Sequence, residues 1–183
     1  MPDAPTRSDL GRLLPLRARH LHRLRLGRTL DVGCGVGRHL RNCGPGSVGV
    51  DHDARAVLTA RAHGLAAYTT AEFEADPELG RPGAFDSLLV SHVLAHLDPA
   101  GGRHLLGRYL PAVRPGGRVV LITPQPAGYR ADPTHVRFVD LPALRELAEL
   151  AGLRIGRGYS HPLPEPAGRL VKYNEYVLVG IVP

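Results

Sequence analysis

The amino-acid sequence predicts an α/β protein with a mostly parallel sheet and helices on both of its faces. Short apolar runs with strand character alternate with segments of helical periodicity over residues 29–123, a pattern typical of such sheets. A glycine-rich turn follows the first of these runs directly. Near the end of the chain, two strand-like runs have no helix between them, which indicates an antiparallel pair.

The chain begins with a predicted basic helix. From Leu14 to Leu26 apolar residues recur at helical spacing, with a proline in the first turn and a glycine after the last residue, as helix ends favour. Residues 1–29 hold seven arginines against two aspartates, a net charge of +5 in a chain with a net charge of +6. We therefore predict a basic helical segment over 1–28 that packs on a domain over 29–183.

Each element after this helix is predicted from its local pattern. Apolar runs bounded by glycine, proline or aspartate indicate strands, and longer amphipathic segments indicate helices. The predicted strands are 29–32, 47–51, 65–69, 85–91, 118–123, 153–159 and 175–182. The predicted helices are 37–43, 54–63, 99–113 and 141–151. The stretch 124–139 is predicted as a long loop, and such loops in compact domains are usually functional or disordered.

Composition restricts the class of protein. A chain of 183 residues with 43% hydrophobic content suits one domain, and no apolar run approaches the roughly 20 residues of a membrane span. We expect a cytoplasmic protein. Because Cys34 and Cys43 are the only cysteines, neither a disulfide framework nor a zinc site is predicted. The excess charge would suit a nucleic-acid partner, but Lys172 is the only lysine, so coding bias also explains the arginines.

The residues that point to chemistry follow the first two strands. Residues 30–37 read Leu-Asp-Val-Gly-Cys-Gly-Val-Gly, and such a glycine turn lets a ligand approach bare backbone. A carboxylate at Asp31 would repel a pyrophosphate but attract the ammonium group of a methionine moiety. Asp51 ends the second strand, where a carboxylate can accept both hydroxyls of a ribose. The pair predicts a nucleoside that carries an amino acid.

This motif resembles that of the class I S-adenosylmethionine-dependent methyltransferases. Residues 85–97 are similar to the fourth strand of that family and the segment after it, and residues 114–118, Arg-Pro-Gly-Gly-Arg, resemble its turn into the fifth strand. The resemblance covers most of residues 29–182. It implies a Rossmann-like, doubly wound, mostly parallel seven-stranded sheet with an antiparallel last strand, and S-adenosyl-L-methionine as the cofactor.

The motif and the resemblance together indicate a set of cofactor contacts. Many members of the family place an acidic residue after the third strand to accept the adenine amino group. Here that segment begins Thr-Thr-Ala-Glu at residue 69, so Thr70, the backbone of Ala71 and Glu72 stay open as alternatives. The expected cofactor-binding residues are Asp31, Gly33, Cys34, Gly35, Gly37, Asp51, His52, Thr70, Ala71, Glu72 and Ser91.

Two of the ten histidines are catalytic candidates. His92 follows the fourth strand, at the edge where open α/β sheets bind ligands. His135 lies in an Asp-Pro-Thr-His segment of the long loop, which resembles a segment over the acceptor site in some small-molecule methyltransferases. Either can orient an acceptor hydroxyl or take its proton. The alternative for His135 is a loop histidine tied to Asp132 or to backbone. Tyr129 and Arg137 are candidates for binding the acceptor.

The predicted function is methyl transfer from S-adenosylmethionine to a small molecule such as a metabolite or sugar. A hydroxyl is the preferred acceptor group, ahead of an amine or a carbon. Ser-His-Val-Leu after the fourth strand differs from the Asn/Asp-Pro-Pro-Tyr/Phe segment of amino-group methylases. Two alternatives stay open: an RNA methyltransferase that docks RNA on the basic helix, and a non-catalytic cofactor-binding module. A homodimer also stays open. No metal and no membrane partner are expected, and His96 is interpreted as an ordinary surface or core residue.

Overall fold

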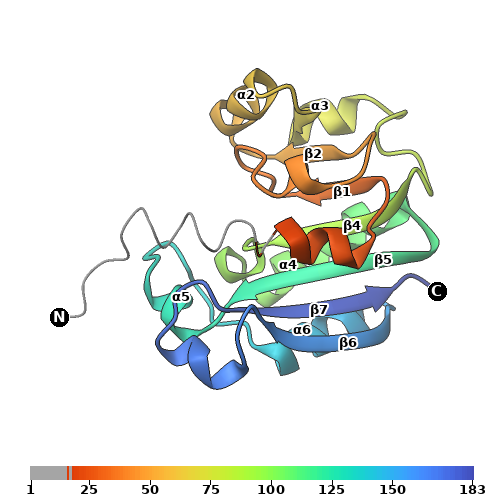
Figure 1. Ribbon diagram of the computed structural model, residues 1–183. Helices are drawn as coiled ribbons and strands as arrows, with labels where there is room; N and C mark the ends of the chain where they lie inside the picture. Colours follow the sequence, from red (N-terminus) through yellow and green to blue (C-terminus); the bar gives the residue numbers. More distant parts are fainter. Residues whose placement is uncertain (1–15, 17) are drawn as a thin grey trace.

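The computed structural model describes residue 16 and residues 18–183, which form one seven-stranded sheet flanked by helices (Figure 1). The strand order is β3-β2-β1-β4-β5-β7-β6. The strands are β1 (Thr29–Val32), β2 (Val48–Asp51), β3 (Ala67–Thr69), β4 (Phe85–Ser91), β5 (Val113–Pro124), β6 (Arg154–His161) and β7 (Glu175–Ile181). Neighbouring strands from β3 to β5 pair in parallel, and β7 runs antiparallel to both β5 and β6. The predicted doubly wound sheet with an antiparallel last strand is confirmed.

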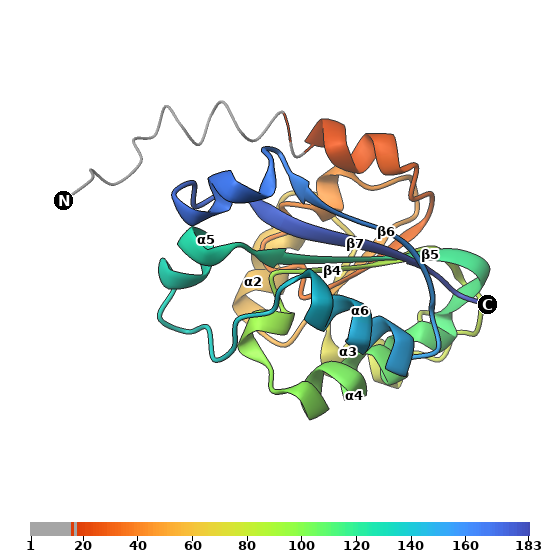
Figure 2. The ribbon, with the colours of Figure 1, turned by 90° about the horizontal axis from the view of Figure 1, so that it is seen from below.

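Helices cover both faces of this sheet, with α4 and α6 on one side and the helix over residues 18–24 on the other (Figure 2). The α-helices with described bounds are α2 (Ala54–Ala62), α3 (Thr70–Ala75), α4 (Pro99–Tyr109), α5 (Pro126–Arg130) and α6 (Leu141–Leu150). Short 3-10 helices are η1 (Leu40–Asn42), η2 (Leu94–His96), η3 (Leu110–Ala112) and η4 (Glu165–Arg169). The predicted long loop therefore contains α5, and α3 is an element that the sequence analysis did not predict.

Polar side chains define where the longer helices begin. Asp53, Asp98 and Asp140 each accept a backbone N–H of the first turn of α2, α4 and α6. At α3, Thr69 and Glu72 form a reciprocal capping box. Each such cap is worth about 1 kcal/mol. These caps explain why the predicted starts of α2, α4 and α6 agree with the structure.

The predicted helix over 37–43 is wrong. Only the 3-10 turn η1 forms there. Gly35 and Gly37 both have positive φ, at +52° and +80°, and the Gly-Pro-Gly sequence at 44–46 follows directly. Glycines in the left-handed region and a proline end helices, so too few residues remain for an α-helix. The glycine turn after β1 is consequently not followed by the helix amino terminus that binds diphosphates in dinucleotide folds.

The helix over 18–24 shares the core of the sheet. Leu21, Leu24 and Leu26 are buried in one cluster with apolar side chains of β4, β5 and β7. The guanidinium of Arg118 donates hydrogen bonds to the carbonyls of Leu24 and Arg25, at 3.0 and 2.7 Å. The predicted start of this helix at Leu14 lies outside the described residues. None of the helices in the described part of the chain is both long enough and apolar enough to cross a bilayer.

We expect Leu24→Ala to lower the free energy of unfolding by about 2–5 kcal/mol, the usual cost of truncating a buried leucine. The Leu24 side chain is 5% exposed and packs on the sheet. Urea denaturation measures the loss, and Arg23→Ala on the exposed side of the same helix is the matched control. A loss below about 0.5 kcal/mol, the usual range for surface substitutions, would instead support a separate segment with a boundary at residue 28.

Candidate functional site

A cleft of about 630 Å³ opens at the carboxyl edge of the sheet. It lies at the ends of β1 and β4, which are neighbours in the sheet although the chain forms β2 and β3 between them. Open α/β sheets bind ligands at such switch points. The walls of the cleft include residues 33–36 of the glycine turn, Ser91, His92 and His96, parts of the loop over 124–139, and residues 172–173.

Two buried polar atoms beside the glycine turn and β4 have no hydrogen-bond partner. Asp31 is 1% exposed, and its Oδ2 has no partner. Ser91 is 7% exposed, and its hydroxyl also has no hydrogen-bond partner. Leaving a buried polar group unpaired costs about 1–3 kcal/mol. These atoms are therefore suited to meet polar groups of a ligand.

The electrostatics at Asp31 favour a cation. Burial, and after it the negative charge of Asp51, raises the pKa of Asp31 to about 7. Burial of Cys34, and after it the negative charges of Asp31 and Asp51, raises the pKa of the Cys34 thiol to about 12. Cys34 therefore stays a neutral thiol, and negative charge near the turn comes from the aspartates. A ligand with a positive group would relieve the repulsion between these carboxylates.

Asp51 ties the end of β2 to the glycine turn. Its Oδ2 accepts the backbone N–H of Gly35 at 2.7 Å, and its Oδ1 accepts the N–H of Asp53 at 2.9 Å. Each carboxylate oxygen has a second lone pair, so Asp51 can still accept ribose hydroxyls. His52 lies 3.3 Å from Asp51, but its side chain is 94% exposed. A side chain at Gly35 would point into open space, which leaves the backbone bare toward a ligand.

The three alternatives for the adenine contact lie at the start of α3. The Glu72 carboxylate already accepts the N–H of Thr69 and a hydrogen bond from Arg61, both at 2.7 Å. These donors lower the pKa of Glu72. The side chain of Thr70 interacts with that of Tyr109. Both donors to Glu72 bind the same oxygen, Oε2, so Glu72 keeps acceptor capacity, and all three alternatives stay open.

His92 forms a pair with a buried carboxylate that the sequence analysis missed. Its Nε2 lies 2.6 Å from Oε1 of Glu175, whose side chain is 3% exposed. His92 has a positive φ of +60°, and its N–H donates to the carbonyl of Ile122 at 2.9 Å. Glu175 begins β7, opposite Pro124 of β5. A histidine oriented by a carboxylate is the usual arrangement of a general base.

A polar network holds Glu175 in place. Gln125, which is fully buried, donates from its amide to the carbonyl of Glu175 at 3.2 Å and to the hydroxyl of Ser160 at 2.7 Å. Asn174 donates to the side-chain oxygen of Gln125 at 3.0 Å. Because these buried groups satisfy one another, the backbone around Glu175 is rigid.

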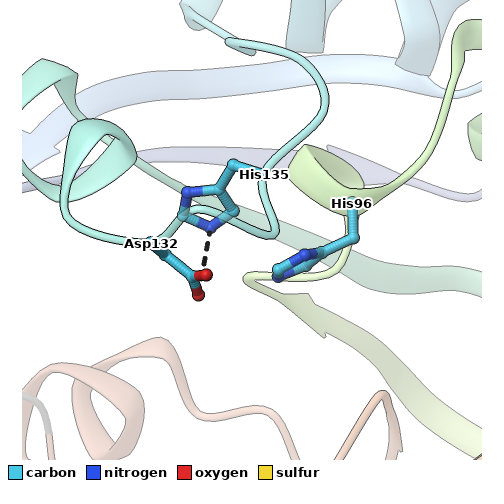
Figure 3. Close-up of side chains that lie close together, drawn as sticks. All are labelled: His96, Asp132 and His135. Atoms are coloured by element: carbon cyan, nitrogen blue, oxygen red, sulfur yellow. Dashed lines mark ion pairs between the residues drawn. The ribbon is translucent and has the colours of Figure 1, made fainter.

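His135 lies near Asp132 and near a backbone carbonyl, the two partners expected of an ordinary loop histidine. It also lines the cleft. Its Nδ1 lies 2.9 Å from the carbonyl of Tyr129, and its Nε2 lies 3.9 Å from Oδ2 of Asp132 (Figure 3). Its ring stacks on the ring of Tyr129, with centroids 5.4 Å apart and an angle of 6°. Tyr129 thus positions His135. The ring of His96, interpreted from the sequence as ordinary, lies 4.7 Å from that of His135.

The structure does not bring Arg137 to this cleft. Arg137 lines a separate hollow of about 230 Å³ beside α4 and α6. The reason is the local backbone: the N–H groups of Val136 and Arg137 both bond to the carbonyl of Ala95, at 2.9 and 3.2 Å. The predicted role of Arg137 in acceptor binding is therefore not supported, whereas Lys172, which the sequence analysis did not choose, lines the cleft.

A glycine turn with two nearby aspartates, at the switch point of a sheet with this strand order, defines a protein of the methyltransferase class. A model of the methyltransferase domain matches residues 7–156. The chain belongs to this family. No curated protein sequence matches it significantly.

Solved structures share the fold at low sequence identity. A SAM-dependent methyltransferase from Archaeoglobus fulgidus has a TM-score of 0.69 and 18% identity, over 96% of this chain and 100% of that one. The N-methyltransferase NodS from Bradyrhizobium japonicum WM9 has a TM-score of 0.67 and 19% identity, over 91% and 94%. Magnesium protoporphyrin IX methyltransferase from Synechocystis with bound SAH has a TM-score of 0.64 and 13% identity, over 99% and 90%. The predicted resemblance to class I enzymes, whose cofactor is S-adenosylmethionine, is confirmed.

Proposed function

We propose that this protein transfers the methyl group of S-adenosylmethionine to a hydroxyl of a small-molecule acceptor. The observation that carries the proposal is the buried, unpartnered Asp31 oxygen beside Asp51, at a glycine turn that no α-helix follows. A diphosphate would meet repulsion there and no helix amino terminus. A ligand with an ammonium group and a ribose is complementary to both aspartates.

The residues of the chain have distinct proposed roles toward the cofactor. Asp31 accepts from the ammonium group, and Asp51 accepts from the ribose hydroxyls. The backbone at Gly35 allows close approach, and the adenine amino group is received at the start of α3, by Thr70, the backbone of Ala71 or Glu72. The hydroxyl of Ser91, buried and without a partner, faces the remaining polar atoms. When bound, S-adenosylmethionine supplies a methyl group on a sulfonium, whose sulfur keeps the bonding electron pair when the methyl group leaves.

The preference for a hydroxyl acceptor rests on the pair formed by His92 and Glu175. A hydroxyl must lose a proton to become a strong nucleophile, and a positioned base contributes about 10²- to 10⁴-fold in rate. His92 lines the cleft and is held 2.6 Å from a buried carboxylate. We propose that His92 accepts the acceptor proton and that His135, which also lines the cleft, orients the acceptor. Structures with the same fold include both an N-methyltransferase and a porphyrin methyltransferase, so the fold alone does not select the acceptor.

The proposal includes a cytoplasmic enzyme. Cys34 and Cys43 are both free thiols, as is usual in a reducing compartment.

Asp51→Ala is expected to weaken binding of S-adenosylhomocysteine by about 10- to 100-fold, because hydrogen bonds to a charged group are worth about 1.5–3 kcal/mol each. Isothermal titration calorimetry measures this loss. The matched control is Asp53→Asn, two residues away, whose amide oxygen still caps α2. Unchanged affinity in a folded Asp51→Ala protein would contradict the site, and so would a wild-type protein that binds NAD⁺ in preference to S-adenosylhomocysteine.

A further inference from the structure

Three side chains with metal-binding atoms meet at the cleft: His96 at the end of η2, and Asp132 and His135 in the loop after α5 (Figure 3). One ligand atom from each residue lies within 4.8 Å of the other two. An ion about 2.1 Å from each ligand would hold these atoms about 3–4 Å apart. The three ligand atoms are therefore already close to the separations that one ion requires.

The two imidazoles are held in the tautomer that a metal site needs. Nδ1 of His96 lies 3.2 Å from the carbonyl of Thr134, and Nδ1 of His135 lies 2.9 Å from the carbonyl of Tyr129. The Thr134 hydroxyl also lies 3.3 Å from Nδ1 of His96, but it donates its proton to Asp132. A carbonyl oxygen only accepts, so each Nδ1 carries the proton and each Nε2 keeps its lone pair. Donation of the second ring N–H to a backbone carbonyl is the usual outer contact of a metal-binding histidine.

The Asp132 carboxylate is oriented in the same way. Its Oδ1 accepts the N–H and the hydroxyl of Thr134, at 2.9 and 2.6 Å. Its Oδ2 is turned toward Nε2 of His135 at 3.9 Å. That distance is too long for a hydrogen bond, and it matches the separation of two ligands on one ion. A direct bond between Asp132 and His135 therefore does not explain the arrangement.

We propose that His96, Asp132 and His135 bind one divalent transition-metal ion, with Zn²⁺ as the preferred species. Two imidazole nitrogens and one carboxylate suit zinc and its neighbours, whereas Mg²⁺ and Ca²⁺ prefer oxygen ligands alone. Three protein ligands leave at least one coordination position open. Because His96, Asp132 and His135 all line the cleft beside the glycine turn, that position opens toward the space assigned to the acceptor.

The metal site and the proposed function are separable. Binding of an ion by these three residues does not depend on methyl transfer. We further infer that an oxygen atom of the acceptor binds at the open coordination position of the ion. This step rests on the proposed function. Coordination occupies Nε2 of His135, so His135 orients the acceptor through the ion, and the acceptor proton stays assigned to His92.

The test uses the full chain, stripped with a chelator and titrated with Zn²⁺ alone by calorimetry. One ion per chain is expected, and His96→Ala and Asp132→Asn should each weaken binding at least about tenfold. His104→Ala, an exposed histidine on α4, is the matched control and should bind as the wild type does. Co²⁺ substitution adds a spectroscopic check, since nitrogen and oxygen ligands give no thiolate-to-metal charge-transfer band.

Three results would overturn the metal site: no stoichiometric ion, an affinity that His96→Ala leaves unchanged, or a thiolate band that puts the ion on Cys34 or Cys43. Binding of S-adenosylhomocysteine is measured on the same samples. If the nucleoside binds and the ion does not, the metal site fails alone. If the ion binds and the nucleoside does not, the proposed function fails and the metal site stands.

Discussion

Asp31→Asn should weaken cofactor binding and at the same time make the ligand-free protein more stable at alkaline pH. The folded protein holds Asp31 with a pKa of about 7, against 3.8 for the ordinary group, because of burial and the neighbouring Asp51. The unfolded chain therefore ionises first as the pH rises. The contribution of Asp31 to the free energy of unfolding is fully present below pH 3.8. It falls between pH 3.8 and about 7 and is lost above that range.

The neutral amide that Asp31→Asn introduces has the shape of the carboxyl group and does not ionise, so the variant avoids this loss. The gain in free energy of unfolding at pH 8.5 is at most about 4 kcal/mol. Urea denaturation at pH 5 and pH 8.5 should show a gap between variant and wild type that widens with pH. Asp76→Asn, at an exposed position, is the control and should show no such widening.

Cofactor binding should respond in the opposite direction. A cationic ligand favours ionised Asp31, so the wild type should bind S-adenosylhomocysteine more tightly as the pH rises through about 7. Asp31→Asn should lose this pH dependence together with most of the affinity. A variant that is less stable than the wild type at pH 8.5 and still binds the nucleoside would contradict the assigned role of Asp31.

The elements that the sequence predicted well are those set by local patterns. Asp31 is the residue before the last in β1 and Asp51 is the last in β2, and the parallel pairing of these strands brings their ends to one edge. Position along the chain was therefore enough to group them. The same local reasoning failed for residues 37–43, because the residues before Gly44 look helical while the glycines on both sides prevent an α-helix.

The contacts missed by the sequence analysis are those that only tertiary structure makes. Glu175 meets His92 because antiparallel β7 places its first residue opposite the end of β5. His96 meets His135 because the carbonyl of Ala95 binds the loop backbone at Val136. Neither pair has a sequence spacing that a motif could record. A metal site that combines His96 with the segment of Asp132 and His135 does not need a Cys/His repeat, so the lack of such a repeat did not exclude it.

The second large effect is expected at His92. His92→Asn should lower the turnover number by about 10²- to 10⁴-fold, the contribution of a positioned base. Asparagine is the suitable replacement because it tolerates the positive φ of +60° at this position. Formation of S-adenosylhomocysteine with a panel of phenols and sugars measures the rate, and His104→Ala is again the exposed control.

Glu175 should act through His92 as a positioning residue. Glu175→Gln keeps a hydrogen-bonding oxygen near Nε2 of His92 but removes the charge that stabilises a protonated imidazole. We expect kcat to fall while KM and the affinity for S-adenosylhomocysteine stay unchanged, which a purely structural defect would not produce. Added imidazole should partly restore the turnover of His92→Asn and not that of Glu175→Gln, because only the first variant lacks the ring. Full turnover in His92→Asn would show that the acceptor needs no base, and the acceptor atom would then be one that is nucleophilic without losing a proton.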